Sequence, residues 1–238
     1  MKTVVLFDID GTLLLSGGAG RRAMERALST HFGQSGPATM RYDGKTDPWI
    51  VRESMRHAGF DDAVIEARMP TVIAHYLEQL EHHLDETRAL PGIHAVVDAV
   101  EAADDLVLGL LTGNVVRGAQ LKLGAIGLAF ERFVVGAFGS DHEDRPALAP
   151  IAQARASEHL GYPVPGDRLV IIGVLDGIND RVDPRQRTRL AEMMLELFEI
   201  VRDHRRHPCL DHRISEPRMA HRLAYDPGIG LPVVAHRG

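Results

Sequence analysis

Near its beginning the chain reads Val4-Val5-Leu6-Phe7-Asp8-Ile9-Asp10-Gly11-Thr12-Leu13-Leu14. The apolar run predicts a strand that ends at two aspartates. Side chains two apart in a strand point the same way, so Asp8 and Asp10 can reach one small volume where the strand ends. Two carboxylates held that close need a cation or a shared proton, and Mg2+ prefers oxygen ligands. With the metal bound, one carboxylate can attack phosphorus while the other handles the proton.

A bare Asp-x-Asp pair would instead indicate an Asp-rich turn after the strand. The full pattern, in which apolar residues lead into Asp8-Ile9-Asp10-Gly11-Thr12, is more specific. It resembles the first motif of the haloacid dehalogenase-like (HAD) hydrolases. The resemblance implies a Mg2+-dependent phosphatase or phosphotransferase. In such an enzyme Asp8 is the nucleophile, Asp10 is the acid and base, and both residues serve the metal.

The composition narrows the class of protein. The 238 residues are 45% hydrophobic and 25% charged, which is ordinary for a globular protein of one large or two modest domains. No run of about 18 apolar residues predicts a membrane span, and no secretory signal pattern is seen. The single cysteine, Cys209, excludes an intrachain disulfide, so we expect a cytoplasmic protein. A net charge of -6 argues against a general nucleic-acid binder.

Strand and helix patterns alternate along most of the chain. Nearly continuous apolar runs at 106–111 and 169–172, with a shorter one at 133–135, predict strands buried on both faces. Helical spacing of apolar residues covers 93–103 and 147–160. This alternation predicts an α/β fold with a doubly wound parallel sheet, which the resemblance identifies as a HAD-type Rossmannoid core.

Residues 18–88 differ, because they contain no convincing strand. Helices are predicted over 19–32, from Asp47-Pro48 to about Gly59, and over 61–86, with a kink or restart at Pro70. A helical block inserted after the first strand suggests a lid, and the resemblance places a C1 cap there. We therefore expect a core made of 1–16 and 89–238 and a helical cap made of 17–88.

The strand at 106–111 leads into Thr112-Gly113-Asn114. A hydroxyl at the end of a buried strand, just before a helix, can bind a phosphoryl oxygen with help from the helix N-terminus. Thr112 or Asn114 acting only as a helix cap is the alternative. In register with the first motif, the segment resembles HAD motif II. Thr112 would then hold the phosphate, with Gly113 and Asn114 beside it. The Leu-Leu-Thr-Gly-Asn segment and the cap position are similar to the phosphoglycolate phosphatase-like group.

A fixed cation should complete the phosphate site. The resemblance implies Lys or Arg, often before Pro, and the best candidate is Arg145 in Asp144-Arg145-Pro146. A surface loop of mixed charge is the alternative. Lys122, on the helix after Thr112, is predicted to be solvated. Lys45, in Gly44-Lys45-Thr46-Asp47, is a candidate for contacting a second anionic group of the substrate, and a plain surface turn is equally compatible with that segment.

The fourth element is Ile171-Ile172-Gly173-Val174-Leu175-Asp176-Gly177-Ile178-Asn179-Asp180. It resembles HAD motif IV, which implies Asp176 as a metal ligand and Asp180 as its support. The first acid comes later after the glycine than the family places it, so an Asp-Gly turn is the competing interpretation.

The resemblance fades beyond residue 180. A helix is predicted from Asp183-Pro184 to about Arg206, and 207–230 are rich in His, Arg, Pro and Gly. The last strand is expected at 231–234, at a sheet edge because of Pro232. His204, His207, Cys209 and His212 match no defensible zinc spacing, and a solvated basic segment is the better interpretation.

Together these patterns predict a Mg2+-dependent phosphatase that hydrolyses a small phosphorylated metabolite through an aspartyl-phosphate. We expect a monomer or homodimer that binds neither nucleic acid nor membrane. A sugar-phosphate mutase of the same fold stays open as an alternative. So does a binding protein without activity, because motif IV and the C-terminal part are atypical.

Overall fold

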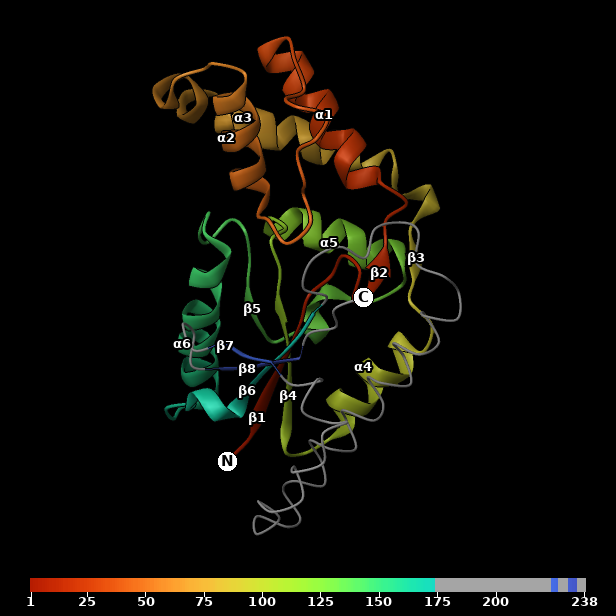
Figure 1. The fold of residues 1–238 in the computed structure, drawn as a ribbon. Helices are drawn as coiled ribbons and strands as arrows, with labels where there is room; N and C mark the ends of the chain where they lie inside the picture. Colours follow the sequence, from red (N-terminus) through yellow and green to blue (C-terminus); the bar gives the residue numbers. More distant parts are fainter. Residues whose placement is uncertain (174–223, 227–230, 235–238) are drawn as a thin grey trace.

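A computed structural model of the protein describes residues 1–173, 224–226 and 231–234. Its main sheet has six strands in the order β5-β4-β1-β6-β8-β7 (Figure 1). The bounds are β1 (Thr3–Phe7), β4 (Leu106–Leu111), β5 (Val135–Ala137), β6 (Leu169–Ile172), β7 (Ala224–Asp226) and β8 (Leu231–Val234). The first five strands in that order run parallel, and β7 is antiparallel to β8. The predicted doubly wound α/β fold is therefore confirmed.

Strand β1 lies between β4 and β6. Phe7, its last residue, pairs in register with Leu110 on one side and with Ile172 on the other. The residues that follow the three strands therefore emerge together at one edge of the sheet. In open α/β sheets this edge, at the carboxyl ends of the strands, is where ligands bind.

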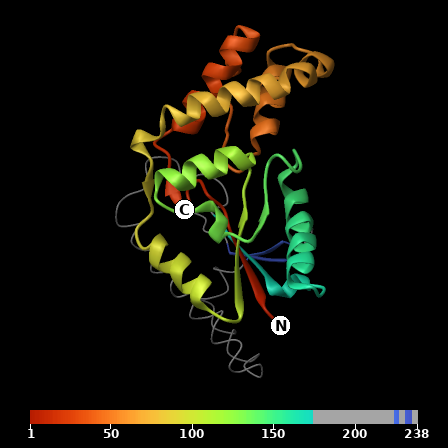
Figure 2. The same ribbon diagram turned by 180° about the vertical axis from the view of Figure 1, so that it is seen from behind.

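Helices cover both faces of the sheet (Figure 2). On one face α4 (Ile93–Ala102) and α5 (Val116–Ala125) pack in the cluster that contains Val5 and Phe7. On the other, α6 (Leu148–Leu160) packs in the cluster that contains Val4 and Leu6. Alternate side chains of β1 thus enter two different cores, and this explains why the strand is apolar from Val4 to Phe7.

Three helices, α1 (Ala19–Phe32), α2 (Asp47–His57) and α3 (Asp62–Glu81), form a layer above the carboxyl edge of the sheet, which we call the cap (Figure 1). They share a core of their own, to which Val115 at the start of α5 contributes. Helix α2 begins one residue earlier than an Asp47 N-cap would require, because the Thr46 side chain accepts a hydrogen bond from the Trp49 N–H. Helix α3 continues through Pro70 instead of restarting there.

The two chain segments that join core and cap pair with each other. β2 (Leu14–Leu15) and β3 (Arg88–Ala89) form a two-stranded antiparallel sheet, with Leu15 opposite Arg88. Short 3-10 helices complete the described part: η1 (Leu84–Glu86), η2 (Phe130–Arg132), η3 (Arg145–Ala147) and η4 (Gly166–Arg168). The division into a core of 1–16 and 89–238 and a cap of 17–88 stays a prediction.

Two strand expectations need correction. The strand expected at 133–135 lies at Val135–Ala137, because the chain first closes the η2 turn and its paired register with β4 begins only at Val135. The strand expected at 231–234 exists, but it lies between β6 and β7 and not at the edge, with Pro232 opposite Tyr225. The predicted helix at 183–206 and the His204–His212 cluster lie outside the described residues.

Within the described ranges, no helix combines the length and the apolar character that crossing a membrane requires.

Candidate active site

Asp8 stands where β1 ends and is buried, with 5% of its surface exposed. Its N–H donates to the Ile172 carbonyl oxygen at 2.8 Å, which extends the pairing of β1 with β6 by one residue. One carboxylate oxygen, Oδ1, accepts the Ile9 N–H at 2.8 Å. The other, Oδ2, contacts Arg145 Nη2 at 2.5 Å. Arg145 belongs to η3, ahead of α6, so the cation proposed from the sequence does lie beside the proposed nucleophile.

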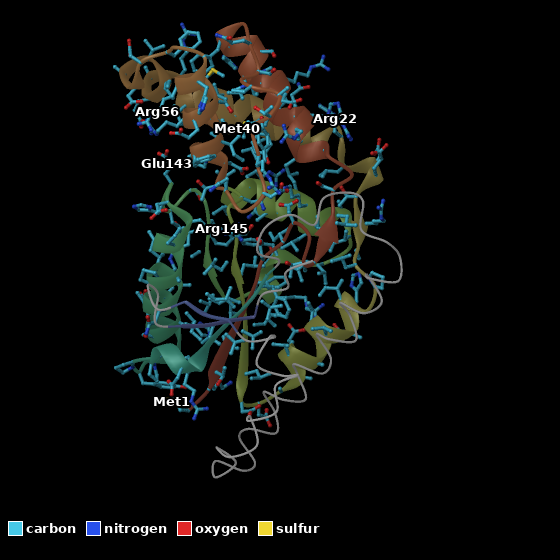
Figure 3. The ribbon with its side chains drawn as sticks, viewed as in Figure 1. Met1, Arg22, Met40, Arg56, Glu143 and Arg145 are labelled. Carbon is cyan, nitrogen blue, oxygen red and sulfur yellow. The ribbon has the colours of Figure 1, made fainter. Side chains whose placement is uncertain are left out.

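Arg145 and Glu143 lie at the end of the core that faces the cap (Figure 3). Both come from the loop between β5 and α6. The ion pair of Arg145 with Asp8 neutralises the buried carboxylate and orients it. The same guanidinium can contact phosphoryl oxygens that approach Asp8.

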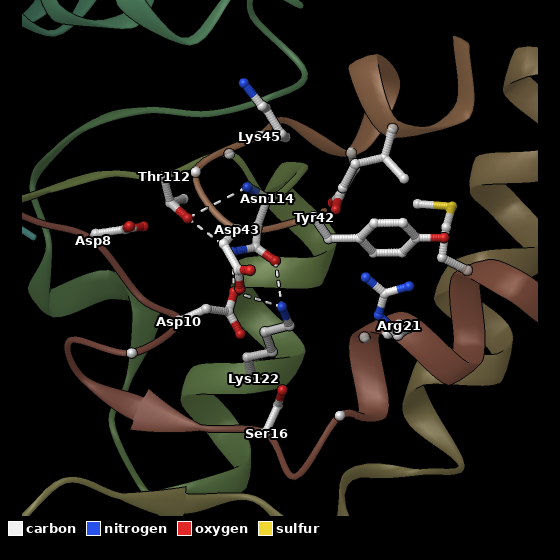
Figure 4. Close-up of a pocket in the computed structure, with 18 of the residues that line it drawn as sticks. Asp8, Asp10, Ser16, Arg21, Tyr42, Asp43, Lys45, Thr112, Asn114 and Lys122 are labelled. Carbon is white, nitrogen blue, oxygen red and sulfur yellow. Dashed lines mark hydrogen bonds and ion pairs between the residues drawn. The ribbon is translucent and has the colours of Figure 1, made fainter. Parts of the chain in front are cut away.

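Thr112 and Asn114 follow β4, next to Asp8. The Thr112 N–H donates to the Ala137 carbonyl oxygen at 3.0 Å, and its side chain is fully buried. The Asn114 amide nitrogen donates to Thr112 Oγ1 and to Asp10 Oδ2, each at 2.8 Å (Figure 4). The motif II residues and Asp10 are therefore joined in one hydrogen-bond network.

Lys122 belongs to this network, and the prediction that it is solvated is wrong. Lys122 is only 4% exposed, and its Nζ contacts Asp10 Oδ2 at 2.7 Å and Asn114 Oδ1 at 2.6 Å. Lys122 lies on α5, eight residues after Asn114, on the side of the helix that faces the site (Figure 4). The cap covers this side: a Cβ placed at Gly20, in the first turn of α1, would be 3.5 Å from Nζ. The sequence of α5 does not indicate that a cap helix covers this side, so it could not show that Lys122 is buried.

Asp10 reaches into the open part of the site, where 42% of its side chain is exposed. Loss of hydration within the cavity raises the pKa of the Asp10 carboxyl. The charge and hydrogen bond of Lys122, together with the Asn114 hydrogen bond and the Arg145 charge, have the opposite effect and prevail, so the pKa lies below 3.8. Asp10 is therefore a carboxylate in the protein without substrate. In this state it can accept a proton.

The cavity between core and cap has a volume of ≈ 420 Å³. Its core wall carries the charged and polar groups described above, and its cap wall includes Arg21, Tyr42, Asp43 and Lys45. Arg21 stacks on the Tyr42 ring, 4.0 Å from its centre, and donates to the Met40 carbonyl oxygen at 2.6 Å. The Lys45 ammonium group lies 4.8 Å from the centre of the Trp49 ring and points away from Asp10 (Figure 4). Its role as a substrate contact stays a prediction.

The start of α2 is fastened to the core. The Asp47 N–H donates to the Gly113 carbonyl oxygen, and Asp47 Oδ2 accepts the Val115 N–H, both at 2.9 Å. A Cβ at Gly113 would overlap the Lys45 carbonyl oxygen, so only glycine allows this close approach. Thr46 Oγ1 donates to the Glu143 carbonyl oxygen at 2.6 Å. These contacts hold the 44–47 loop over the end of β4.

Asp47 is a functional candidate that sequence reasoning missed, because Asp-Pro at a helix start is explained by capping alone. Burial raises the pKa of its carboxyl to about 6, against the influence of Lys122 and the Val115 N–H, which favour the ionised form. The carboxyl is also hydrogen-bonded to Tyr76 from α3. Burial, with the neighbouring Asp47 and Asp10, raises the pKa of the Tyr76 hydroxyl well above 10. Asp47 thus joins two cap helices to the start of α5.

The oxygen donors at the end of β1 fit a magnesium site. A carboxylate such as that of Asp8 and a backbone carbonyl such as that of Asp10, completed by water and a substrate phosphate, supply the oxygen ligands that Mg2+ prefers. Gly173, directly after β6, lies against Asp8, since a Cβ placed there would be 3.2 Å from Asp8 Cβ. Asp176 and Asp180 lie outside the described residues. Within the described ranges, no group of three or more His, Cys, Asp or Glu side chains could hold a metal.

Comparison with known proteins points to one family. A family model for haloacid dehalogenase-like hydrolases matches residues 2–181. No protein with a curated description matches the chain in sequence.

Solved structures share the fold. The chain is similar to CbbY from Rhodobacter sphaeroides in complex with phosphate, with 20% identity, a TM-score of 0.54, and coverage of 79% of this chain and 84% of that one. A hydrolase from Pseudomonas syringae gives 23% identity, a TM-score of 0.53, and coverage of 78% and 81%. A predicted phosphoglycolate phosphatase from Haemophilus somnus gives 16% identity, a TM-score of 0.54, and coverage of 82% and 98%.

Proposed function

The chain belongs to the haloacid dehalogenase-like hydrolases, and we propose that it is a Mg2+-dependent phosphatase acting on a small phosphate monoester. The observation that carries the proposal is the convergence at the ends of β1 and β4. Buried Asp8 is paired with Arg145 there, next to the network of Thr112, Asn114 and Asp10. All five residues line the cavity under the cap.

In the first step, an Asp8 carboxylate oxygen attacks the substrate phosphorus. A P–O bond to Asp8 forms while the P–O bond to the leaving alcohol breaks, which gives an aspartyl-phosphate. Arg145 and the Thr112 hydroxyl bind the phosphoryl oxygens and neutralise the charge that gathers on them. Arg145 must turn part of its guanidinium from Asp8 to the substrate, and its two parallel donors allow both contacts.

Asp10 handles the proton in both steps. The carboxylate is ionised in the free enzyme, and the negative phosphoryl group raises its pKa on binding, because like charges disfavour ionisation. Protonated Asp10 gives its proton to the leaving alcohol oxygen. As a carboxylate again, it takes a proton from the water that attacks the aspartyl-phosphate, and inorganic phosphate is released.

Mg2+ would be held by the Asp8 carboxylate, the backbone carbonyl oxygen of Asp10 and Asp176, with Asp180 in support, and would supply positive charge to the phosphoryl oxygens. The cap excludes bulk water from the reaction, and the 44–47 loop, with Lys45 as a proposed substrate contact, would select the leaving group.

The test is release of phosphate from p-nitrophenyl phosphate and from a panel of small phosphate monoesters, with Mg2+ or with excess chelator. We expect activity that requires Mg2+ and falls at least about 1,000-fold in Asp8→Asn, because the nucleophile is lost. Asp104→Asn, at an exposed aspartate near the opposite edge of the sheet, is the matched control and should keep full activity. A wild-type protein that releases no phosphate from any ester would exclude the proposal, and isomerised sugar phosphate in place of free phosphate would identify a mutase.

A further inference from the structure

Lys122 has no part in the reaction proposed above, although its ammonium group contacts Asp10. The ammonium is removed from water, with 5% of the side chain exposed, and lies between the Asp10 carboxylate and the Asn114 amide oxygen. Burying such a charge costs several kcal/mol before its partners offset it. Its neighbours on α5, Ala119 and Leu123, are fully buried in the apolar core. An apolar residue at 122 would serve packing as well or better, so stability alone does not account for the lysine.

The direction of the contacts suggests a role in the reaction. Lys122 Nζ and Asn114 Nδ2 both donate to the same oxygen of Asp10, Oδ2. Two donors on one oxygen restrain the carboxyl group of Asp10, which lines the cavity, and leave Oδ1 without a contact to either donor. Asn114 is itself held by Lys122, and it donates to the Thr112 hydroxyl. The buried Lys122 ammonium therefore orients both the Asp10 carboxylate, which would move the proton, and, through Asn114, the Thr112 hydroxyl, which would bind phosphate.

We propose that Lys122 is a positioning residue, which through Oδ2 of Asp10 and the Asn114 amide holds Oδ1 of Asp10 in line with the leaving-group oxygen and then with the attacking water. This inference rests on the proposed phosphatase function. It adds a residue from α5 to the machinery, beyond the strand-end motifs.

The test separates the two proton transfers by choice of ester. p-Nitrophenolate is a good leaving group and needs no proton, so its departure does not require proton transfer from Asp10. An aliphatic alcohol leaves only when protonated, whereas hydrolysis of the aspartyl-phosphate needs a base with either ester. In Lys122→Met we expect a rapid burst of about one p-nitrophenolate per enzyme, formed within about fivefold of the wild-type rate. Steady turnover should then be about 100-fold slower, because a displaced acid–base group costs roughly that factor.

With an aliphatic ester such as glycerol phosphate, Lys122→Met should show no burst, and its first step should itself be about 100-fold slower. Lys2→Met makes the same chemical change at an exposed lysine before β1, at the far end of the strand, and should behave as wild type. Lys122→Arg keeps the positive charge, and its steady turnover should be at least about tenfold faster than that of Lys122→Met. Lys122→Gln, a polar side chain of similar reach, gives the same comparison if the Met variant does not fold.

Two outcomes would overturn the inference. In one, Lys122→Met keeps wild-type turnover with both esters. In the other, the burst disappears and both esters lose rate by the same factor, which indicates a general structural role. A wild-type enzyme without phosphatase activity would count against the proposed function itself. The two failures are therefore distinguishable.

Discussion

Replacing Asp47 with asparagine should make the stability of the protein less dependent on pH. Asp47 is 7% exposed, and burial raises the pKa of its carboxyl from 3.8 to about 6 in the folded protein. A raised folded-state pKa means that the protonated carboxyl stabilises the fold. The stabilisation is complete below about pH 3.8 and is lost as the pH rises through about 6. Asparagine keeps an acceptor for the Val115 N–H and does not titrate.

The magnitude follows from the same two pKa values. At 1.36 kcal/mol for each pKa unit, the difference corresponds to about 3 kcal/mol, of which about 2 kcal/mol falls between pH 4 and pH 7. The free energy of unfolding of Asp47→Asn minus that of wild type should therefore rise by about that amount from pH 4 to pH 7. Taking the difference between the two proteins removes the titration of all other groups.

Urea denaturation followed by circular dichroism at several pH values measures this difference. Asp43→Asn, at an exposed aspartate just before the same loop, makes the same chemical change outside the buried contact and is the matched control. A constant difference between Asp47→Asn and wild type from pH 4 to pH 7 would refute the reasoning. It would mean that water reaches the carboxyl and that the contact between cap and core at Val115 is not kept in solution.

Two further substitutions test the site and its lid. Arg145→Ala should lower kcat/KM for phosphate esters by about 100-fold, and Arg145→Lys by less, because lysine keeps the charge but loses the parallel donors. Equal losses in steady-state assays would contradict this, because they would show that the charge without the parallel donors contributes nothing. Gly113→Ala should lower the free energy of unfolding by about 1–3 kcal/mol and should raise KM, because the added Cβ would displace the Lys45 carbonyl and the 44–47 loop. An unchanged melting temperature in thermal unfolding would contradict the close approach of this loop to Gly113.

Strands β1, β4 and β6 were predictable because each is a short, almost continuous apolar run. Leu106–Leu111 and Leu169–Ile172 have the predicted bounds, and the helices begin and end within a few residues of the predicted positions. The strand near 135 was misplaced because Gly136 and Ala137 carry little apolar signal, whereas Phe133 and Val134 carry much. Periodicity reports apolar surface, and it does not report which backbone segment reaches the neighbouring strand.

The site was predictable where its residues follow strands, and not where they depend on the cap. Asp8, Asp10 and Thr112 were found because they directly follow strands that share one edge of the sheet. Asp47 was missed because its environment is made by two segments about 70 residues apart in sequence, the start of α2 and the start of α5. Lys122 was missed because its partner Asp10 and the first turn of α1, which covers it, both lie more than about 100 residues earlier in the chain. A lysine on an amphipathic helix is usually solvated, and only the cap above α5 removes this one from water.

The pairing of β2 with β3 makes the cap a removable insert. The chain leaves the core at Leu15 and returns at Arg88, and these two residues stand directly opposite each other on adjacent antiparallel strands. A gap of that width is closed by a two-residue hairpin turn, so a core lacking the helices would need no rearrangement of its sheet. The same pair of strands, β2 and β3, could carry an unrelated inserted segment of any size. In this architecture the inserted segment can be exchanged without changing the order or the pairing of the core strands.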